Sequence, residues 1–340
     1  MLYAVFDSSP WSAPLIGFFT ALALVLILGG AVIRWLRGFA RESIKSDSER
    51  LNELHAVKKE TPTMGGILIV VTFVIAGGLA GVTSVTVFCG AAFAALSLMI
   101  LGGADDWIKR TTASKGLTAR QKLTGQIVIG GLASMFLIPM RLPDSMDVST
   151  FVWLSAFVVW STFVITATSN AVNLTDGLDG LASGCTVITS IALGAGLMIG
   201  FDHGSLSEDE REASILFLTL AGSCSGFLWF NRYPAKVFMG DAGSLPIGGI
   251  LAILSLASGI ELTLALCGGV FVIETFSVIL QVFWYRRTKT RLLLCSPLHN
   301  HFVFRGLEER RIVRLFWLAA VLFGSVGFMV MKCITLVWNS

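Results

Sequence analysis

Long apolar runs separated by polar gaps constrain the fold of this chain more than any other feature. Each run approaches the roughly 20 residues that a helix needs to cross a bilayer, and 54% of all residues are hydrophobic against 14% charged, unlike a soluble domain. No linker or internal repeat divides the chain. We therefore predict one all-α, polytopic membrane domain over residues 1–340, with about ten transmembrane helices at 13–36, 63–80, 85–102, 123–140, 151–170, 181–200, 214–230, 244–257, 262–285 and 313–337.

Positive charge is concentrated in every second gap between these runs. Of the 25 Lys and Arg residues, 22 lie in or beside the gaps that follow the first, third, seventh and ninth runs; the exceptions are Arg141, Arg211 and Lys332. Since a Lys/Arg excess marks cytoplasmic loops, we predict that these gaps face the cytoplasm and that both termini are periplasmic. No small-residue cleavage site follows the first run, so we expect no signal peptide. The net charge of +3 reflects this local bias and does not indicate a nucleic-acid partner.

Two adjacent carboxylates stand at the cytoplasmic end of the third run. Asp105 and Asp106 are followed by Lys109. Adjacent carboxylates repel each other and are costly near a membrane unless a cation or solvent compensates them. A solvated helix end would explain an isolated pair, but the polar residues of the other inner gaps favour a site.

The gap after the fifth run contains amides and carboxylates but no Lys or Arg. Asn170, Asn173, Asp176 and Asp179 recur at every third residue, which places them roughly on one face of a helical turn. Such a set suits a cation or a polar ligand. Helix capping followed by glycine turns explains the same residues, and both interpretations stay open.

Three further gaps add candidate residues. Asp241 follows Gly240 and is surrounded by small residues, where backbone and ligand can approach closely, whereas Phe238 is either a core residue or a stacking platform. His299 and His301 form an H-x-H pair, and two ligands do not make a zinc site; the basic residues beside them point to phosphate instead. The lysines before the second run either anchor a helix at the headgroups or reach an anionic substrate.

Carboxylates and lysines on one membrane face suit a particular chemistry. Mg²⁺ is usually held by one or two carboxylates together with substrate phosphates. The inner gaps supply such carboxylates, with lysines for the phosphate charge. We therefore predict a Mg²⁺-dependent transferase of the phosphoryl type at the inner leaflet.

The same motifs resemble those of one known family. Thr61-Pro-Thr-Met-Gly-Gly66, Asp105-Asp106, the segments 170–180 and 231–243, and Pro297-Leu-His-Asn-His-Phe302 occur in order along the whole chain and are similar to phospho-N-acetylmuramoyl-pentapeptide transferase, the MraY translocase family. The resemblance implies transfer of phospho-MurNAc-pentapeptide from its UDP carrier to undecaprenyl phosphate, giving lipid I and UMP with Mg²⁺. It also implies a homodimer in the bacterial inner membrane.

The resemblance assigns roles to particular residues. It implies that Asp241 binds Mg²⁺ and that the catalytic residues are Asp105, Asp106, Asp241 and His299. It places Phe238 where the uracil ring binds. The remaining residues are predicted to bind substrate around the uridine, the phosphates and the sugar: Lys58, Lys59, Thr61, Lys109, Lys122, Asn170, Asn173, Asp176, Asp179, Asn231 and His301.

The chain departs from the family pattern at three positions. Glu60 replaces the usual Gly before Thr-Pro-Thr, Asn300 replaces the middle His of a triple-His run, and Val303 replaces a usual Glu. The first departure puts the local turn in question. The other two put contacts of the last inner gap with sugar or peptide in question.

For the mechanism, we favour direct attack by the lipid phosphate on the sugar-linked phosphorus. A phosphate monoester has a second pKa near ~6, so the nucleophile is already largely dianionic and hardly requires a general base. A two-step path through an aspartyl-phosphate is the alternative.

Two other functions compete with the predicted one: transfer of GlcNAc-1-phosphate from UDP-GlcNAc to a polyprenyl phosphate, and membrane transport. Transport is disfavoured because Glu274 is the single acid well inside a run.

Overall fold

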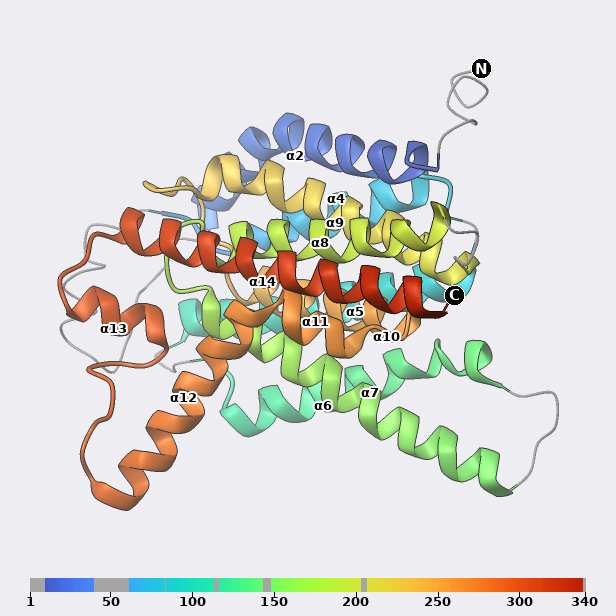
Figure 1. The fold of residues 1–340 in the computed structure, drawn as a ribbon. Helices are drawn as coiled ribbons and strands as arrows, with labels where there is room; N and C mark the ends of the chain where they lie inside the picture. The colour runs from blue at the N-terminus through green and yellow to red at the C-terminus, as the bar shows by residue number, and fades with distance from the viewer. Residues whose placement is uncertain are drawn as a thin grey trace.

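The computed structural model describes residues 10–39, 61–82, 84–112, 116–142, 148–202 and 207–338, and the regular elements within these ranges are helices (Figure 1). The predicted residues Lys58 and Lys59 and the departure at Glu60 lie outside these ranges. The helices are α2 (Ser12–Phe39), α4 (Gly66–Leu79), α5 (Val85–Thr111), α6 (Ala119–Met135), the 3₁₀ turn η2 (Ile138–Arg141), α7 (Val148–Thr175), α8 (Leu181–Asp202), α9 (Glu208–Asn231), α10 (Asp241–Ala257), α11 (Glu261–Cys267), α12 (Gly269–Thr288), α13 (Leu298–Phe304) and α14 (Glu309–Trp338).

Seven of these helices are long and apolar enough to cross a membrane: α2, α5, α7, α8, α9, α12 and α14. The shorter α4 and α10 are also apolar. The chain is thus an all-α, polytopic membrane protein, as the runs predict. The number of ten crossings stays a prediction.

Helix α10 forms the centre of the bundle, since all 17 of its residues are buried. It packs mainly against α5 and α7 and also against α4 and α9. At 1.5 Å per residue α10 is only about 25 Å long. Asp241 is its first residue and is buried, so the packing of α10 decides where that carboxylate lies.

Glycines let the neighbouring helices approach the start of α10 closely. A side chain at Gly66 of α4 would collide with the backbone of Gly243, and one at Gly102 of α5 would collide with the carbonyl group of Asp241. Small residues at helix contacts are the usual means of close packing in membranes, where burial of apolar surface adds little. These contacts fix α4 and α5 against the end of α10 that carries Asp241.

The run 262–285 is not one helix, and here our prediction of the elements is wrong. Helix α11 ends at Cys267, and α12 begins at Gly269 after a break at Gly268. Two consecutive glycines, Gly268 at the break and Gly269 after it, disfavour a continuous helix. Figure 1 shows α12 leaving the main bundle at a steep angle, followed by α13, which lies beside the start of α14.

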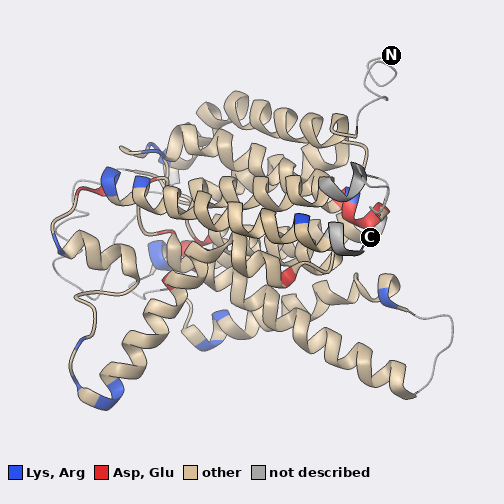
Figure 2. Ribbon diagram, viewed as in Figure 1, with Lys and Arg blue, Asp and Glu red and all other residues tan. Residues whose placement is uncertain are grey.

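Charge is distributed unequally between the two ends of the bundle. Figure 2 shows most Lys and Arg segments at the end where α13 lies, which we call the basic end. The acids of the first turn of α9, Glu208, Asp209 and Glu210, lie at the opposite end (Figure 2). This asymmetry matches the pattern on which the predicted orientation depends, while the orientation itself stays a prediction.

Candidate active site

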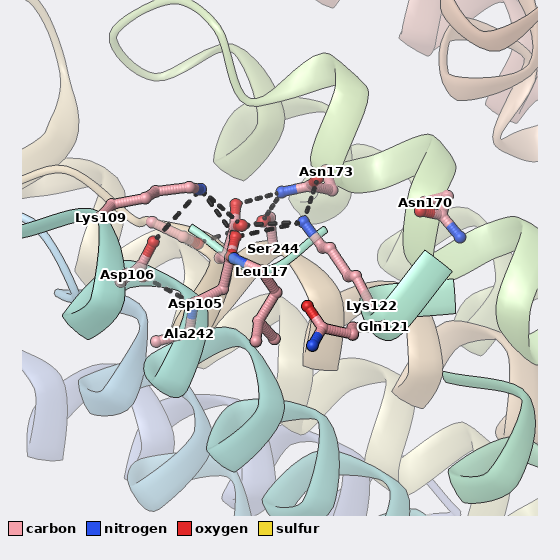
Figure 3. Close-up of polar contacts among 12 residues, drawn as sticks. Asp105, Asp106, Lys109, Leu117, Gln121, Lys122, Asn170, Asn173, Ala242 and Ser244 are labelled. Carbon is pink, nitrogen blue, oxygen red and sulfur yellow. Dashed lines mark hydrogen bonds and ion pairs between the residues drawn. The ribbon is translucent and has the colours of Figure 1, made fainter. Parts of the chain in front are cut away.

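Three carboxylates and two lysines meet near the start of α10, and we call Asp105, Asp106, Asp241, Lys109 and Lys122 the acid–lysine cluster (Figure 3). Lys109 Nζ lies 2.8 Å from both Asp105 Oδ2 and Asp241 Oδ2, and 3.9 Å from Asp106 Oδ1. Lys122 Nζ lies 2.8 Å from Asp241 Oδ2 and 3.8 Å from Asp105 Oδ2. The sequence predicts all five residues as site residues, and the structure brings them together.

Backbone groups hold the two carboxylates of α5 in place. Asp105 Oδ1 accepts a hydrogen bond from Leu117 N at 2.6 Å, and Asp106 Oδ2 accepts one from Ala242 N at 3.0 Å. The second bond satisfies a donor of the first turn of α10, where negative charge is also favoured by the helix dipole. The carboxylates are 3% and 7% exposed, so their positions are set by the protein rather than by solvent.

Gly240 permits the approach of Asp106 to α10. Its φ of +70° lies in the region that favours glycine. A side chain at this position would also press on Asp106 Oδ2 and on Thr63 Oγ1. The Gly-Asp-Ala-Gly segment is a weak signal in the sequence. In the structure it is the turn that brings the carboxylate of Asp241 close to that of Asp106.

Lys122 reaches the cluster because α6 begins at a defined residue. Thr118 accepts a hydrogen bond from Gln121 N, and the Gln121 side chain accepts one from Thr118 N, which forms a capping box. Lys122 follows directly and points toward the cluster in Figure 3. The Thr-x-x-Gln pattern of the sequence is a signal for this helix start.

The two asparagines at the end of α7 behave differently. Asn173 Nδ2 donates to Asp241 Oδ1 at 2.6 Å and to Ser244 Oγ at 2.8 Å, while its carbonyl oxygen accepts from Lys122 Nζ at 3.1 Å. Asn170 Nδ2 donates to Gln126 Oε1 and to Thr166 O, and Figure 3 shows it apart from the cluster. The structure thus joins Asn173 to the cluster and leaves Asn170 in a contact between helices.

Asn231 and Asp179 join the segments 176–183 and 231–237. Asn231 Oδ1 accepts from Gly180 N and Ser183 Oγ, and its amide nitrogen donates to Val237 O. Asp179 Oδ2 accepts from Ala235 N at 2.9 Å. Both residues are at least 96% buried, so in this structure they hold the two segments together. The partially buried Asp176 follows α7 in the same turn.

Phe238 lies in a segment that pairs with the start of α4. Its backbone N donates to Pro62 O at 2.8 Å, and its carbonyl group accepts from Gly65 N at 2.9 Å. Phe238 is partly exposed as a residue, as is Thr61. The motif Thr61–Gly66 therefore supports the backbone of Phe238.

The two histidines of the H-x-H pair have different partners. His301 Nδ1 accepts from Leu294 N at 3.1 Å and so holds the preceding segment. His299 is 1% exposed, its backbone N donates to Glu274 Oε1 at 3.1 Å, and its Nδ1 lies 3.2 Å from Glu274 Oε2. The ring of His299 faces Gly177, the residue after Asp176.

Three residues outside our predicted set support this region. Ser244 accepts from Asn173, Glu309 Oε1 accepts from Asp179 N at 2.8 Å, and Gln281 accepts from the backbone N–H groups of Leu292 and Leu293. The contacts of Ser244 and Glu309 join segments that are far apart in the chain, whereas Gln281 holds the segment that follows its own helix. Glu309 and Gln281 carry no local sequence signal that distinguishes them from ordinary helix residues.

The carboxylates of the acid–lysine cluster are the candidate ligands for a metal ion. Within the described ranges no group of three or more His, Cys, Asp or Glu side chains forms a ready-made metal site. An ammonium group instead stands between the carboxylates of the cluster. Three carboxylates nevertheless face only two lysines, and their hard oxygen atoms are the kind that Mg²⁺ uses when substrate phosphates supply the other ligands. The residues present fit such a shared site.

Comparison with known proteins supports one family. Residues 88–259 match the model of glycosyl transferase family 4, and residues 58–70 match phospho-N-acetylmuramoyl-pentapeptide-transferase signature 1. The first match includes the whole acid–lysine cluster.

Similar whole proteins carry the same name. The chain is 39% identical over 339 residues to a phospho-N-acetylmuramoyl-pentapeptide-transferase of Granulibacter bethesdensis, which covers 92% of this chain and 91% of that protein. It is 37% identical over 338 residues to the protein of that name from Rickettsia felis and 38% identical over 333 residues to that from Rickettsia rickettsii, covering 92% of this chain and 90% of each relative.

Proposed function

The chain belongs to the phospho-N-acetylmuramoyl-pentapeptide transferase family, and from this premise we propose that the acid–lysine cluster is its catalytic centre. The protein transfers phospho-MurNAc-pentapeptide from UDP-MurNAc-pentapeptide to undecaprenyl phosphate, which gives lipid I and UMP in peptidoglycan biosynthesis. It is a multi-pass protein of the bacterial inner membrane. The observation that carries the proposal is the meeting of three carboxylates and two lysines at the basic end.

The lysines address the main electrostatic problem of this reaction. Both reactants carry phosphate, so they repel each other, and charge accumulates on the departing UMP. Positioned cations reduce this cost in phosphoryl transfer. The Lys109 side chain is 40% exposed although its Nζ contacts two carboxylates, so it is accessible to a phosphate from solvent. Lys122 is more enclosed, at 17%.

We assign Mg²⁺ to the carboxylates of the cluster. Asp241 would hold the ion, with Asp105 and Asp106 nearby as essential carboxylates. When bound, the ion neutralises phosphate charge and stabilises the leaving group. The excess of one carboxylate over the lysines supports this assignment, because that excess needs a further positive charge.

The transfer proceeds by direct attack in this proposal. An oxygen of the lipid phosphate forms a bond to the sugar-linked phosphorus, while the bond from that phosphorus to the oxygen of UMP breaks. UMP leaves as a phosphate monoester, and the nucleophile is largely dianionic at neutral pH, since its second pKa is near ~6. The carboxylates of α5 need only orient the reactants, because no proton has to be removed.

The other predicted residues fall into two groups. Phe238, which is partly exposed, offers a ring for the uracil. Asn173 lies in the last turn of α7, and Asp176 and His299 lie at the turn that follows it. Asn231 and Asp179 act by holding that turn and the segment of Phe238 in register. The homodimer is also part of the proposal and rests on the family alone.

Purified protein tests the assignment. It should release UMP from UDP-MurNAc-pentapeptide when polyprenyl phosphate and Mg²⁺ are present, and chelation with EDTA should stop the release until Mg²⁺ is restored. UDP-GlcNAc serves as the competing donor. Faster release from UDP-GlcNAc would contradict the substrate assignment, and full activity in EDTA would contradict the role of the metal.

A further inference from the structure

Glu274 is a carboxylate inside a membrane-spanning helix, and its position requires a reason. It lies in the second turn of α12, and its exposed fraction is 0%. An ionisable group at membrane depth is costly and marks a functional contact by default. Within the described part of the chain, its side chain accepts a hydrogen bond from His299 and makes an ion-pair contact with the ring of the same residue, which follows 25 residues later.

The contact between these two residues fixes both a backbone and a ring. Glu274 Oε1 accepts from His299 N, in the first turn of α13. Glu274 Oε2 lies 3.2 Å from Nδ1, which is an ion-pair distance, although the atoms are not aligned as a hydrogen bond. A carboxylate beside Nδ1 favours a proton on that nitrogen, as in other histidines that are oriented by an acid.

The opposite nitrogen of the ring faces the site. His299 Nε2 is buried and has no hydrogen-bond partner within the described part of the chain, and it packs against Gly177, where a side chain would collide with it. A buried polar atom without a partner is costly. Gly177 is four residues after Asn173, whose amide contacts Asp241, so Nε2 and the acid–lysine cluster flank the same turn.

We propose that Glu274 is the positioning residue that orients His299 toward the phosphate-bearing substrate. This inference rests on the proposed function, since it assigns His299 Nε2 a phosphoryl oxygen as its missing partner. The carboxylate then stands beside Nδ1 on one side of the ring, and the phosphate meets Nε2 on the other. Glu274 itself does not touch the substrate.

The variant Glu274→Gln tests the charge while preserving the shape. The amide oxygen can still accept from His299 N, but a neutral group then stands beside Nδ1. We expect the turnover number for UMP release to fall about 10- to 100-fold, the range for outer partners of functional imidazoles. In a His299→Gln background, Glu274→Gln should change turnover by less than about 2-fold, because residues that act through one contact are not additive.

Glu212 supplies a matched control. It is also a fully buried glutamate of a membrane-spanning helix, and it accepts a hydrogen bond from a backbone group, Ser84 N, at 2.5 Å. Any effect of Glu212→Gln on turnover should be the same factor with and without His299. Equal factors for Glu274→Gln in the two backgrounds would show a merely structural role and overturn the inference. Wild-type protein without UMP release would instead overturn the proposed function.

A spectroscopic readout separates orientation from activity. In protein with ¹⁵N-labelled histidine, the His299 ring signals are identified by their loss in His299→Gln among the four histidines. Glu274→Gln should shift these signals, and Glu212→Gln should not. Unchanged His299 signals in Glu274→Gln would refute the inference. If Glu274→Gln does not yield folded protein, Glu274→Asp, which keeps the charge at a shorter reach, is taken through the same cycle with the same expectation of non-additivity.

Discussion

Asp241→Asn is the sharpest perturbation of the acid–lysine cluster, because it removes one charge and almost no volume. Asp241 contacts both lysines at 2.8 Å. At an effective dielectric constant of about 20, each such contact has a gross attraction of about 6 kcal/mol, and desolvation of the charges offsets much of it. The variant also leaves two carboxylates facing two lysines, so the charges of the cluster balance.

Asp241→Asn should therefore lower the turnover number strongly and leave the thermal stability nearly unchanged. Because like-charge repulsion among the carboxylates falls while the lysines lose a partner, we expect the protein to remain folded, with a thermal midpoint close to that of the wild type. Turnover should fall by at least about 10³-fold, the upper range for loss of one preorganised electrostatic group, since the remaining carboxylates no longer carry an excess charge for Mg²⁺.

The assay is UMP release at saturating substrate and Mg²⁺, with folding checked by gel filtration and thermal unfolding. Asp209→Asn is the control, because it removes a carboxylate at the opposite end of the bundle, where Asp209 contacts Ser84; its turnover should match the wild type. Activity of Asp241→Asn within a few-fold of wild type would refute the assignment of the metal to this cluster.

Three further outcomes are expected. If either carboxylate at the end of α5 formed a phosphoryl-enzyme, labelled UMP would exchange into the UDP-sugar without lipid; we expect no exchange once residual lipid is removed, and robust exchange would establish the two-step path. Asn300→His should leave turnover nearly unchanged, whereas His299→Ala should lower it by about 10²-fold or more; equal turnover in His299→Ala and wild type would remove this residue from the site. Asn173→Ala should lower turnover by about 10-fold or more because it removes contacts to Asp241 and Lys122, and Asn170→Ala, its matched control, should act mainly on the thermal midpoint; the reverse order would contradict the division between the two amides.

The cluster was predictable from the sequence because its residues violate the ordinary composition of a membrane protein. Carboxylates such as Asp105 and Asp106 at the end of an apolar run must be compensated, and the gap that follows them supplies lysines. That reasoning identifies which residues meet but not how they meet. The ammonium group of Lys109 between two carboxylates and the backbone donor Ala242 depend on the packing of α5 against α10.

Periodicity alone could not separate Asn170 from Asn173. Residues three apart on a helix are rotated by about 300°, so their side chains diverge by about 60°. On α7 this divergence turns Asn170 to Gln126 of α6 and Asn173 to Asp241 of α10. The outcome depends on which helix packs on each side, and this information is not contained in the spacing. The break at Gly268 was missed for a similar reason, since apolar residues continue on both sides of it.

Glu274 shows how an apparent exception in a sequence becomes part of a site in three dimensions. It is the single acid well inside a run, whereas a transport pathway is lined by several ionisable groups along a route through the membrane. In the structure its carboxylate contacts the backbone and the ring of His299. The H-x-H motif and the intramembrane acid are thus one unit, which the chain assembles by folding α13 back against α12. A carboxylate that contacts a residue of the candidate site gives no support to a route across the bilayer, which agrees with the sequence, where a single isolated acid already disfavours transport.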